Sequence, residues 1–229
     1  MQYYSTWIIL LPVLVFAMYA QMKVQNTFRK YLRHPAYSGK TGAQVARELL
    51  DRNNLYDVQV VRTNRMLGDH YDPRARVIRL SPEVYDGRSV AALGVAAHET
   101  GHALQHARNY LPLALRNSIF PLAAFGSQMA LPLVFMGLFF QGAGLGWLMD
   151  LGILFFLTAI LFQVITLPVE FNASRRAMGM LTTGGYIVQG EVGQTREILS
   201  AAALTYVAAV AVAVGELLRL LILRNSRRD

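Results

Sequence analysis

The chain has 229 residues, of which 54% are hydrophobic, and its 22 Lys and Arg against 14 Asp and Glu give a net charge of +8. Several apolar runs approach 20 residues, which is more apolar surface than a soluble domain of this length can bury, so the composition predicts an integral membrane protein. The chain contains no cysteine, which excludes disulfides, thiolate metal sites and a cysteine nucleophile. We attribute the positive charge to residues that flank membrane segments, and we expect no nucleic-acid partner.

The first apolar segment runs from about Tyr3 to Ala20. Four basic residues follow it, namely Lys23, Arg29, Lys30 and Arg33. A cleaved signal peptide has its basic residues in front of the apolar run, so this charge order predicts an uncleaved membrane anchor. The positive-inside rule then places the amino terminus outside and the following region in the cytoplasm.

Residues 21–116 form the polar part of the chain, with 15 Lys and Arg against eight Asp and Glu. Thr41 and Gln44 form a capping-box pattern, which predicts the start of a helix. A second helix is predicted over about 89–108, where apolar and small residues precede a cluster of histidines.

Two short strands are predicted between these helices, over 58–61 and 75–80. The stretch 68–73 between them is rich in turn-forming residues. We therefore expect the two strands to form a small hairpin.

The stretch from His98 to His102 reads His-Glu-Thr-Gly-His and lies within the second predicted helix. Histidines four apart on a helix point the same way and can hold one zinc ion, with Glu99 between them placed to activate a water molecule. Glu99 would accept the proton of that water and pass it to the leaving amine. This motif predicts a zinc-dependent hydrolase that acts on peptide bonds.

Two further apolar runs, 119–140 and 147–167, are each long enough to cross a bilayer. The glycine-rich stretch 141–146 joins them as a short turn. They predict a transmembrane hairpin whose two ends return to the cytoplasmic side.

A last apolar segment, about 198–223, precedes Arg224, Arg227 and Arg228. If this segment crosses the membrane, the three arginines end up outside, against the positive-inside rule. The sequence leaves open whether the segment crosses, lies in the interface or packs within the helix bundle.

Two histidines leave a catalytic zinc one protein ligand short. Glu170 is favoured as the third ligand because it follows the transmembrane hairpin on the side of the zinc motif, whereas Asp150 lies near the hairpin turn on the far side. The remaining candidates are Asp72, Glu191 and Glu197. The alternative role of Glu170 is an interfacial charge paired with Arg175 or Arg176.

A tetrahedral oxyanion needs a further donor, and His70 or Tyr71 could supply it. The alternative is that both merely structure the turn at 72–73. The strand after them could receive an extended substrate by edge pairing. His106 shares the face of His102 but lies one helical turn further on, so a packing or surface role is favoured for it.

Five stretches together resemble the YugP-like neutral zinc metallopeptidases of bacteria. They are His98 to His102, Asp69 to Pro73, Arg79 to Pro82, Pro168 to Phe171, and Ala201 to Tyr206. The resemblance covers nearly the whole chain and implies a membrane-embedded zinc peptidase with a gluzincin-like site. It implies one catalytic Zn²⁺ held by His98, His102 and Glu170, with Glu99 as the base.

Asn172 and Ser174, which follow Glu170 in the sequence, are candidates for orienting a zinc-binding imidazole. Asn172 stands where the family pattern leads us to expect aspartate, and a neutral amide would do this more weakly. Ser174, four residues after Glu170, is a second candidate partner.

The fold class predicted is a mainly α membrane protein, with transmembrane helices and a small α+β zinc-metallopeptidase domain that contains a short β-hairpin. Five segments are expected: an anchor (1–20), a cytoplasmic metallopeptidase domain (21–116), a transmembrane hairpin (117–168), a third-ligand helix with its connector (169–197), and a C-terminal apolar helix with a basic tail (198–229).

The function predicted is a zinc endopeptidase of the bacterial cytoplasmic membrane that cleaves membrane or membrane-proximal proteins near the inner surface. An intramembrane protease is disfavoured because few apolar residues precede the zinc motif on its helix. A zinc-stabilised scaffold without turnover would not need Glu99, and a zinc transporter would need a chain of ionisable residues in its spans. Manganese or cobalt could occupy the same ligand set.

Overall fold

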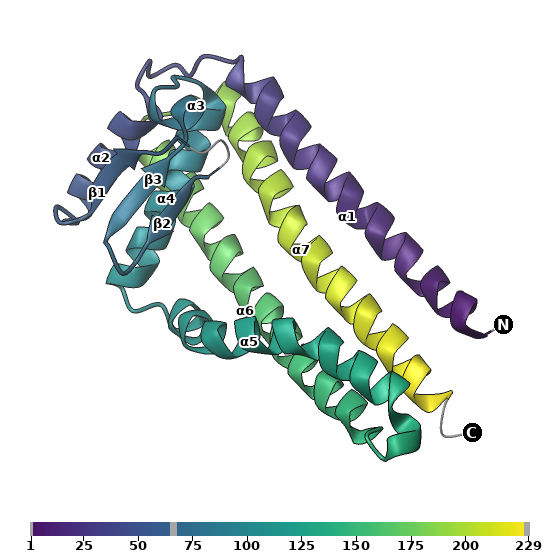
Figure 1. The fold of residues 1–229 in the computed structure, drawn as a ribbon. Helices are drawn as coiled ribbons and strands as arrows, with labels where there is room; N and C mark the ends of the chain where they lie inside the picture. The colour runs from purple at the N-terminus through teal and green to yellow at the C-terminus, as the bar shows by residue number, and fades with distance from the viewer. Residues whose placement is uncertain (1, 65–67, 227–229) are drawn as a thin grey trace. The chain divides into compact units, whose positions relative to one another are not determined.

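The computed structural model describes residues 2–64 and 68–226, with side chains described from residue 8 onward (Figure 1). Arg227 and Arg228, which bear on the orientation of the last segment, lie outside the described residues. The elements are α1 (Gln2–Leu32), α2 (Gly42–Arg52), β1 (Gln59–Arg62), β2 (His70–Asp72), β3 (Val77–Leu80), α3 (Pro82–Tyr85), α4 (Val90–Ala107), α5 (Leu111–Phe139), the 3-10 helix η1 (Gln141–Ala143), α6 (Trp147–Thr183) and α7 (Gln189–Asn225). The chain is mainly helical with one small sheet, as the sequence predicted.

Two compact units make up the chain. The helical unit comprises Met1–Gln21, Ala114–Pro168 and Thr205–Asp229, and the mixed unit comprises Met22–Leu113 and Val169–Leu204. The boundaries between the units fall inside α1, α5, α6 and α7 rather than in loops.

Four helices in the described residues are long and apolar enough to cross a membrane: α1, from Ile8 onward, α5, α6 and α7. Each has at least 25 residues, whereas a hydrocarbon core of about 30 Å needs only about 20 residues of helix. The sequence left open whether the last apolar segment crosses the membrane. In the structure this segment is part of one continuous helix, α7, of 37 residues.

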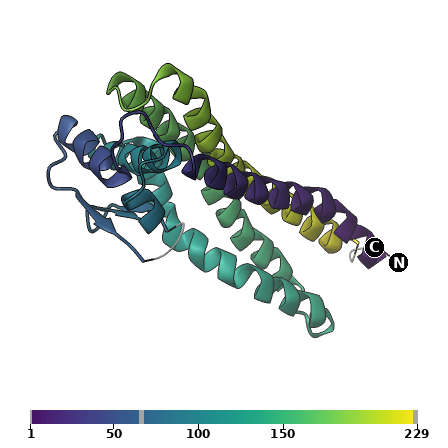
Figure 2. The same cartoon turned by 90° about the horizontal axis from the view of Figure 1, so that it is seen from above.

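Within the helical unit, the end of α7 packs beside the turn between α5 and α6. Leu220 of α7 shares a buried cluster with Val134, Met149 and Ile153. Arg224 forms an ion pair with Asp150, close to that turn. Figures 1 and 2 both show α7 running beside α1. The carboxyl end of α7 and the α5–α6 turn therefore lie at the same end of this unit.

The mixed unit contains a three-stranded sheet with the order β1-β3-β2. β1 pairs with β3 in parallel, from Gln59 opposite Val77, whereas β2 pairs with β3 antiparallel. A β-hairpin is present, but β2 and β3 form it. The predicted hairpin pairing of 58–61 with 75–80 was wrong, because the stretch taken as a turn contains β2 and carries the chain across to a parallel register.

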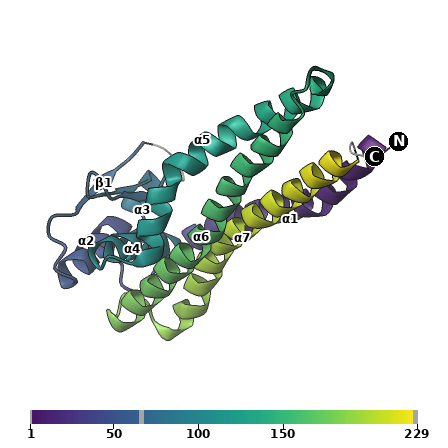
Figure 3. The ribbon, with the colours of Figure 1, turned by 90° about the horizontal axis from the view of Figure 1, so that it is seen from below.

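Helix α4 has the sheet on one side and the ends of α6 and α7 on the other (Figure 3). Ala96 and Ala103 pack against Ile78 and Leu80 of β3. On the other side, a second cluster joins Ala91, Leu93 and Ala97 of α4 to Ala177 and Leu181 of α6 and Ile198 and Leu199 of α7. Small side chains on α4 let its neighbours approach closely, so its position is fixed from both sides.

Candidate metal centre

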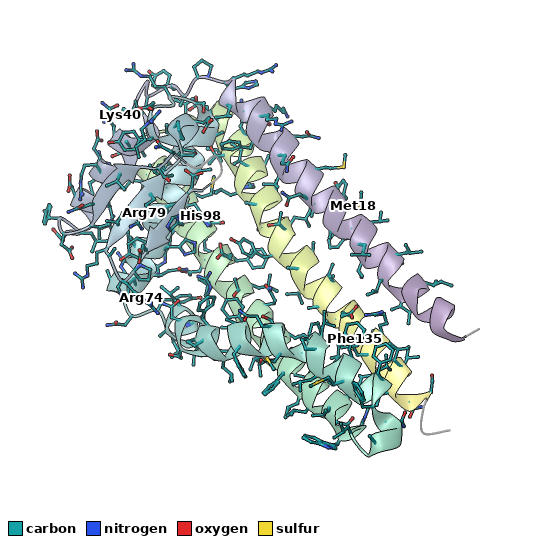
Figure 4. All side chains as sticks on the ribbon, in the orientation of Figure 1. Met18, Lys40, Arg74, Arg79, His98 and Phe135 are labelled. Carbon is teal, nitrogen blue, oxygen red and sulfur yellow. The ribbon has the colours of Figure 1, made fainter. Side chains whose placement is uncertain are left out.

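Helix α4 carries both histidines of the His-Glu-Thr-Gly-His motif. The helix begins after Ser89, whose side chain accepts a hydrogen bond from the amide of Ala92 at 3.1 Å and caps the amino end. The spacing of four residues brings the rings of His98 and His102 to one side, with their centroids 4.8 Å apart. Figure 4 labels His98 on this helix.

Glu170 on α6 lies against the same two rings. Its Oε2 is 3.2 Å from Nε2 of His98 and 3.5 Å from Nε2 of His102. Glu170 is 2% exposed, and the three side chains offer ligand atoms that all lie within 4.8 Å of one another. The structure therefore brings together the three residues that were proposed as metal ligands.

The chemistry of this set fits a zinc ion. Nδ1 of His98 is 3.2 Å from the hydroxyl of Ser174, and Nδ1 of His102 is 3.0 Å from Oε1 of Gln105. With the Nδ1 atoms bonded to the protein, the two Nε2 atoms face the carboxylate of Glu170, and a cation satisfies all three groups at once. Two imidazoles and one carboxylate, with a fourth position for water, are typical of catalytic zinc.

Negative charge gathers around these histidines. Burial lowers the pKa of His102, but the hydrogen bond to Glu170 and the charge of Glu99 outweigh this, so the pKa lies above its usual value. Glu99 itself is only 7% exposed. The electrostatic field therefore favours a positive ion at the centre.

Asp69, just before β2, is a further acidic group within electrostatic range of Glu99. Burial raises the pKa of Asp69, hydrogen bonds from Ser81 oppose the rise, and the charge of Glu99 adds to it. The amide and hydroxyl of Ser81 both donate to this carboxylate, at 2.7 and 3.0 Å. These bonds tie the start of the β-hairpin to the end of β3.

Gly101 lets α4 and α6 approach closely enough for the ligands to meet. A Cβ atom at Gly101 would lie 2.7 Å from the carbonyl oxygen of Ala173, where real Cβ atoms are essentially never found. We therefore expect Gly101→Ala to push the helices apart, to destabilise the protein by about 1–3 kcal/mol and to weaken zinc binding. Thermal unfolding and zinc titration of the purified protein measure the two effects.

Gly94→Ala is the matched control, because it changes a glycine of the same helix. Its added Cβ would meet only a methyl group of Thr195, at an ordinary 3.7 Å. This variant should keep its zinc affinity and its stability, or gain up to about 1 kcal/mol from the better helix propensity of alanine. Equal zinc affinities for the two variants would show that close approach at Gly101 is not what brings the ligands together.

The two residues predicted to stabilise an oxyanion make other contacts. His70 is exposed, and its Nδ1 lies 2.7 Å from the carbonyl oxygen of Gly68. The Tyr71 hydroxyl lies 2.9 Å from Nδ1 of His106, beside a cavity of about 270 Å³ that both residues line. His106 thus contacts β2, while an oxyanion role for His70 or Tyr71 stays a prediction.

The other carboxylates considered as the third ligand are engaged elsewhere. Asp72 accepts from backbone amides of its turn and from Arg79, and Glu191 accepts from the amides of Tyr37 and Val188. Glu197 contacts Tyr31 and Lys30, and Asp150 pairs with Arg224. Among the described residues, only Glu170 joins His98 and His102 in a possible metal-binding group.

Asn172 lies next to the metal centre, but its contact with an imidazole runs through Gln105. The Gln105 amide donates to Asn172 Oδ1 at 3.1 Å and to the carbonyl oxygen of Val169 at 2.7 Å. Nε of Arg176, considered earlier as a partner for Glu170, donates to the same Asn172 oxygen at 2.7 Å. Sequence reasoning missed Gln105, whose only signal is its position three residues after His102 on the same helix.

A His-His-Glu cluster on two helices, with a buried glutamate inside the motif, is the arrangement that a zinc metallopeptidase requires. Comparison with known proteins agrees: the chain belongs to the family described as "Putative neutral zinc metallopeptidase", whose model matches residues 6–225. It is 51% identical over 213 residues, 92% of each chain, to the "Putative membrane protease YugP" of Bacillus subtilis (strain 168). No solved structure matches the chain. The family resemblance seen in the sequence motifs is confirmed.

Proposed function

We propose that this protein is a membrane-anchored zinc endopeptidase. The observation that carries the proposal is the meeting of His98, His102 and Glu170, from α4 and α6, with ligand atoms within 4.8 Å of one another. The buried Glu99 beside this group supports turnover, because a purely structural metal site needs no base.

Each residue of the centre has a distinct task in this proposal. His98, His102 and Glu170 hold the zinc, which when bound lowers the pKa of water and polarises the carbonyl of the substrate. Glu99 takes the proton of the attacking water and delivers it to the leaving amine. Ser174 and Gln105 orient the two imidazoles through their Nδ1 atoms.

The proposed location is the cytoplasmic membrane of a bacterium, with the metal centre on the cytoplasmic side and membrane or membrane-proximal proteins as substrates. Four candidate spans and the printed name of the Bacillus relative, a membrane protease, support the membrane location. The basic residues that follow the apolar part of α1 support the cytoplasmic side, because positive charge is retained there.

The proposal is tested with the full chain purified in detergent and given an unfolded protein as substrate. Cleavage should require zinc, stop when a chelator removes it, and return when zinc is added back. Mass spectrometry of the products locates new peptide ends and separates cleavage from contamination. A zinc-loaded, folded protein that cleaves neither this substrate nor membrane proteins would favour a scaffold without turnover.

The path of the chain through the membrane can be tested by labelling, because the chain has no native cysteine. If all four helices cross, Ser226 and Gly144 lie outside, while Tyr37 lies in the cytoplasm. In intact cells, Ser226→Cys and Gly144→Cys should therefore react with a membrane-impermeant maleimide. Tyr37→Cys, at a side chain that is 77% exposed, should react only after the membrane is opened.

Contacts within the helical unit explain how α7 could cross against the positive-inside rule. The charge of Arg224 is paired with Asp150, and Nε of Arg219 donates to Glu216 at 3.0 Å. Pairing lowers the effective positive charge at this end of α7. Labelling of Ser226→Cys only after cell opening would instead show that α7 does not cross.

A further inference from the structure

We infer that Arg176, through Asn172 and Gln105 and together with the Val169 carbonyl, sets which nitrogen of His102 is left free for the zinc. The side chains of Arg176, Asn172, Gln105 and His102 are joined in this order by hydrogen bonds, which lead from α6 to the metal centre. The inference rests on the proposed zinc site and adds a positioning role for residues that do not touch the metal.

The direction of this line is set at its outer end. A guanidinium can only donate hydrogen bonds, so the atom of Asn172 that faces Nε of Arg176 at 2.7 Å must be its oxygen. The same oxygen lies 3.1 Å from the side-chain amide of Gln105, which must therefore present its NH₂ group. The cation thus fixes the Asn172 amide, and the Val169 carbonyl, which can only accept, holds the Gln105 amide in the same orientation.

The consequence reaches His102 through the other end of Gln105. With its NH₂ group turned toward Asn172 and the Val169 carbonyl, Gln105 presents its oxygen to Nδ1 of His102 at 3.0 Å. An oxygen acceptor requires a proton on Nδ1, and Nε2 is then the lone-pair nitrogen that faces Glu170. A reversed Gln105 would present NH₂ to Nδ1 and favour the wrong tautomer for zinc binding.

Burial makes this restraint strict. Gln105 is 0% exposed, so no bulk water competes for its amide, and a reversed amide would point its oxygen at the oxygens of Val169 and Asn172. His98 is held differently, because the hydroxyl of Ser174 can either donate or accept at Nδ1. Only His102 has its tautomer imposed from outside the site.

The test is the zinc affinity of the full chain in detergent, measured by competition with a chelator. Gln105→Leu should weaken zinc binding by about 10- to 100-fold, which is the usual effect of removing the hydrogen-bond partner of a metal ligand. Arg176→Met should weaken it by up to about 10-fold, because Asn172 can then reverse, turn its NH₂ group toward that of Gln105 and oppose the orientation that the Val169 carbonyl favours. Arg176→Lys, which still only donates, should restore most of the native affinity.

Two comparisons separate positioning from general damage. Arg175→Met removes the adjacent, exposed arginine, which lies outside the hydrogen-bonded line, and should leave zinc affinity unchanged. The double variant Gln105→Leu/Arg176→Met should bind zinc no more weakly than Gln105→Leu alone, because both changes act through one path. Ser174→Ala, which acts on His98, should add its own loss to that of Gln105→Leu.

Native zinc affinity in Gln105→Leu, or equal effects of Arg176→Met and Arg175→Met, would overturn this inference while leaving the proposed peptidase intact. If Gln105→Leu does not fold, the zinc affinities of Arg176→Met and Arg176→Lys still test the inference, because Arg176 is partly exposed. A native chain that binds no zinc would overturn the proposed function itself, and with it this role of Gln105. Because affinity is measured without substrate, the two failures are distinguishable.

Discussion

Glu99→Gln is expected to abolish peptide-bond cleavage while the protein keeps its zinc. Glu99 is buried in the zinc motif but is not one of the three clustered ligands, and glutamine has nearly the same shape without a basic oxygen. General acid–base catalysis by one side chain contributes about 10² to 10⁴ in rate, so the loss of turnover should be at least of this order. Zinc content is measured on the same sample as cleavage.

Glu83→Gln on α3 is the matched control, because it makes the same chemical change outside the metal centre. It should cleave at the native rate. In cells, protein amino termini that disappear from membranes with Glu99→Gln but remain with Glu83→Gln would be candidate cleavage products. A Glu99→Gln protein that cleaves normally would remove Glu99 from the mechanism, and one that has lost its zinc would show a role in metal binding.

Glu170→Ala is expected to remove zinc from the protein. The change deletes one of three clustered ligands and leaves His98 and His102 facing an empty space in a buried site. Loss of a hydrogen-bond partner of a metal ligand weakens metal binding by about 10- to 100-fold. Here a ligand itself is lost, so the zinc affinity should fall by more than this. Chelator competition measures the affinity, and cleavage should be lost in parallel.

Asp150→Asn is the control for this second prediction, since it changes another carboxylate that the sequence offered as the third ligand. Asp150 belongs to the helical unit and pairs with Arg224. Its change should leave zinc affinity at the native value. If instead Glu170→Ala retained zinc, the cluster would not be the metal site, and Glu170 would be a structural carboxylate between two imidazoles.

Features that depend on neighbours in the chain could be predicted. The spacing of His98 and His102 places them on one side of any α-helix, and the capping box at Thr41 and Gln44 is present as expected. Length and hydropathy alone identified the candidate spans, because a bilayer has a fixed thickness. Such features follow from the geometry of a single helix.

Features that depend on distant segments were harder to predict. Strand β1 was paired wrongly because the β-pattern of a strand says nothing about which partner it takes or in which direction. Tyr71 was considered as an oxyanion donor, but only the packing of β2 on α4 brings its hydroxyl to His106. Gln105 went unnoticed because glutamine in a helix carries no signal until its partners on α6 are known.

The sequence by itself determined the class of chemistry: a zinc motif on a helix, no thiol ligands, and a chain apolar enough for a membrane. These depend on residue type and short spacing, which folding does not change. The tertiary structure decided which carboxylate meets the histidines and how Gln105 and Asn172 lie beside them. These depend on the crossing of α4 and α6 at Gly101 and Ala173, 72 residues apart in the chain, which no local pattern encodes.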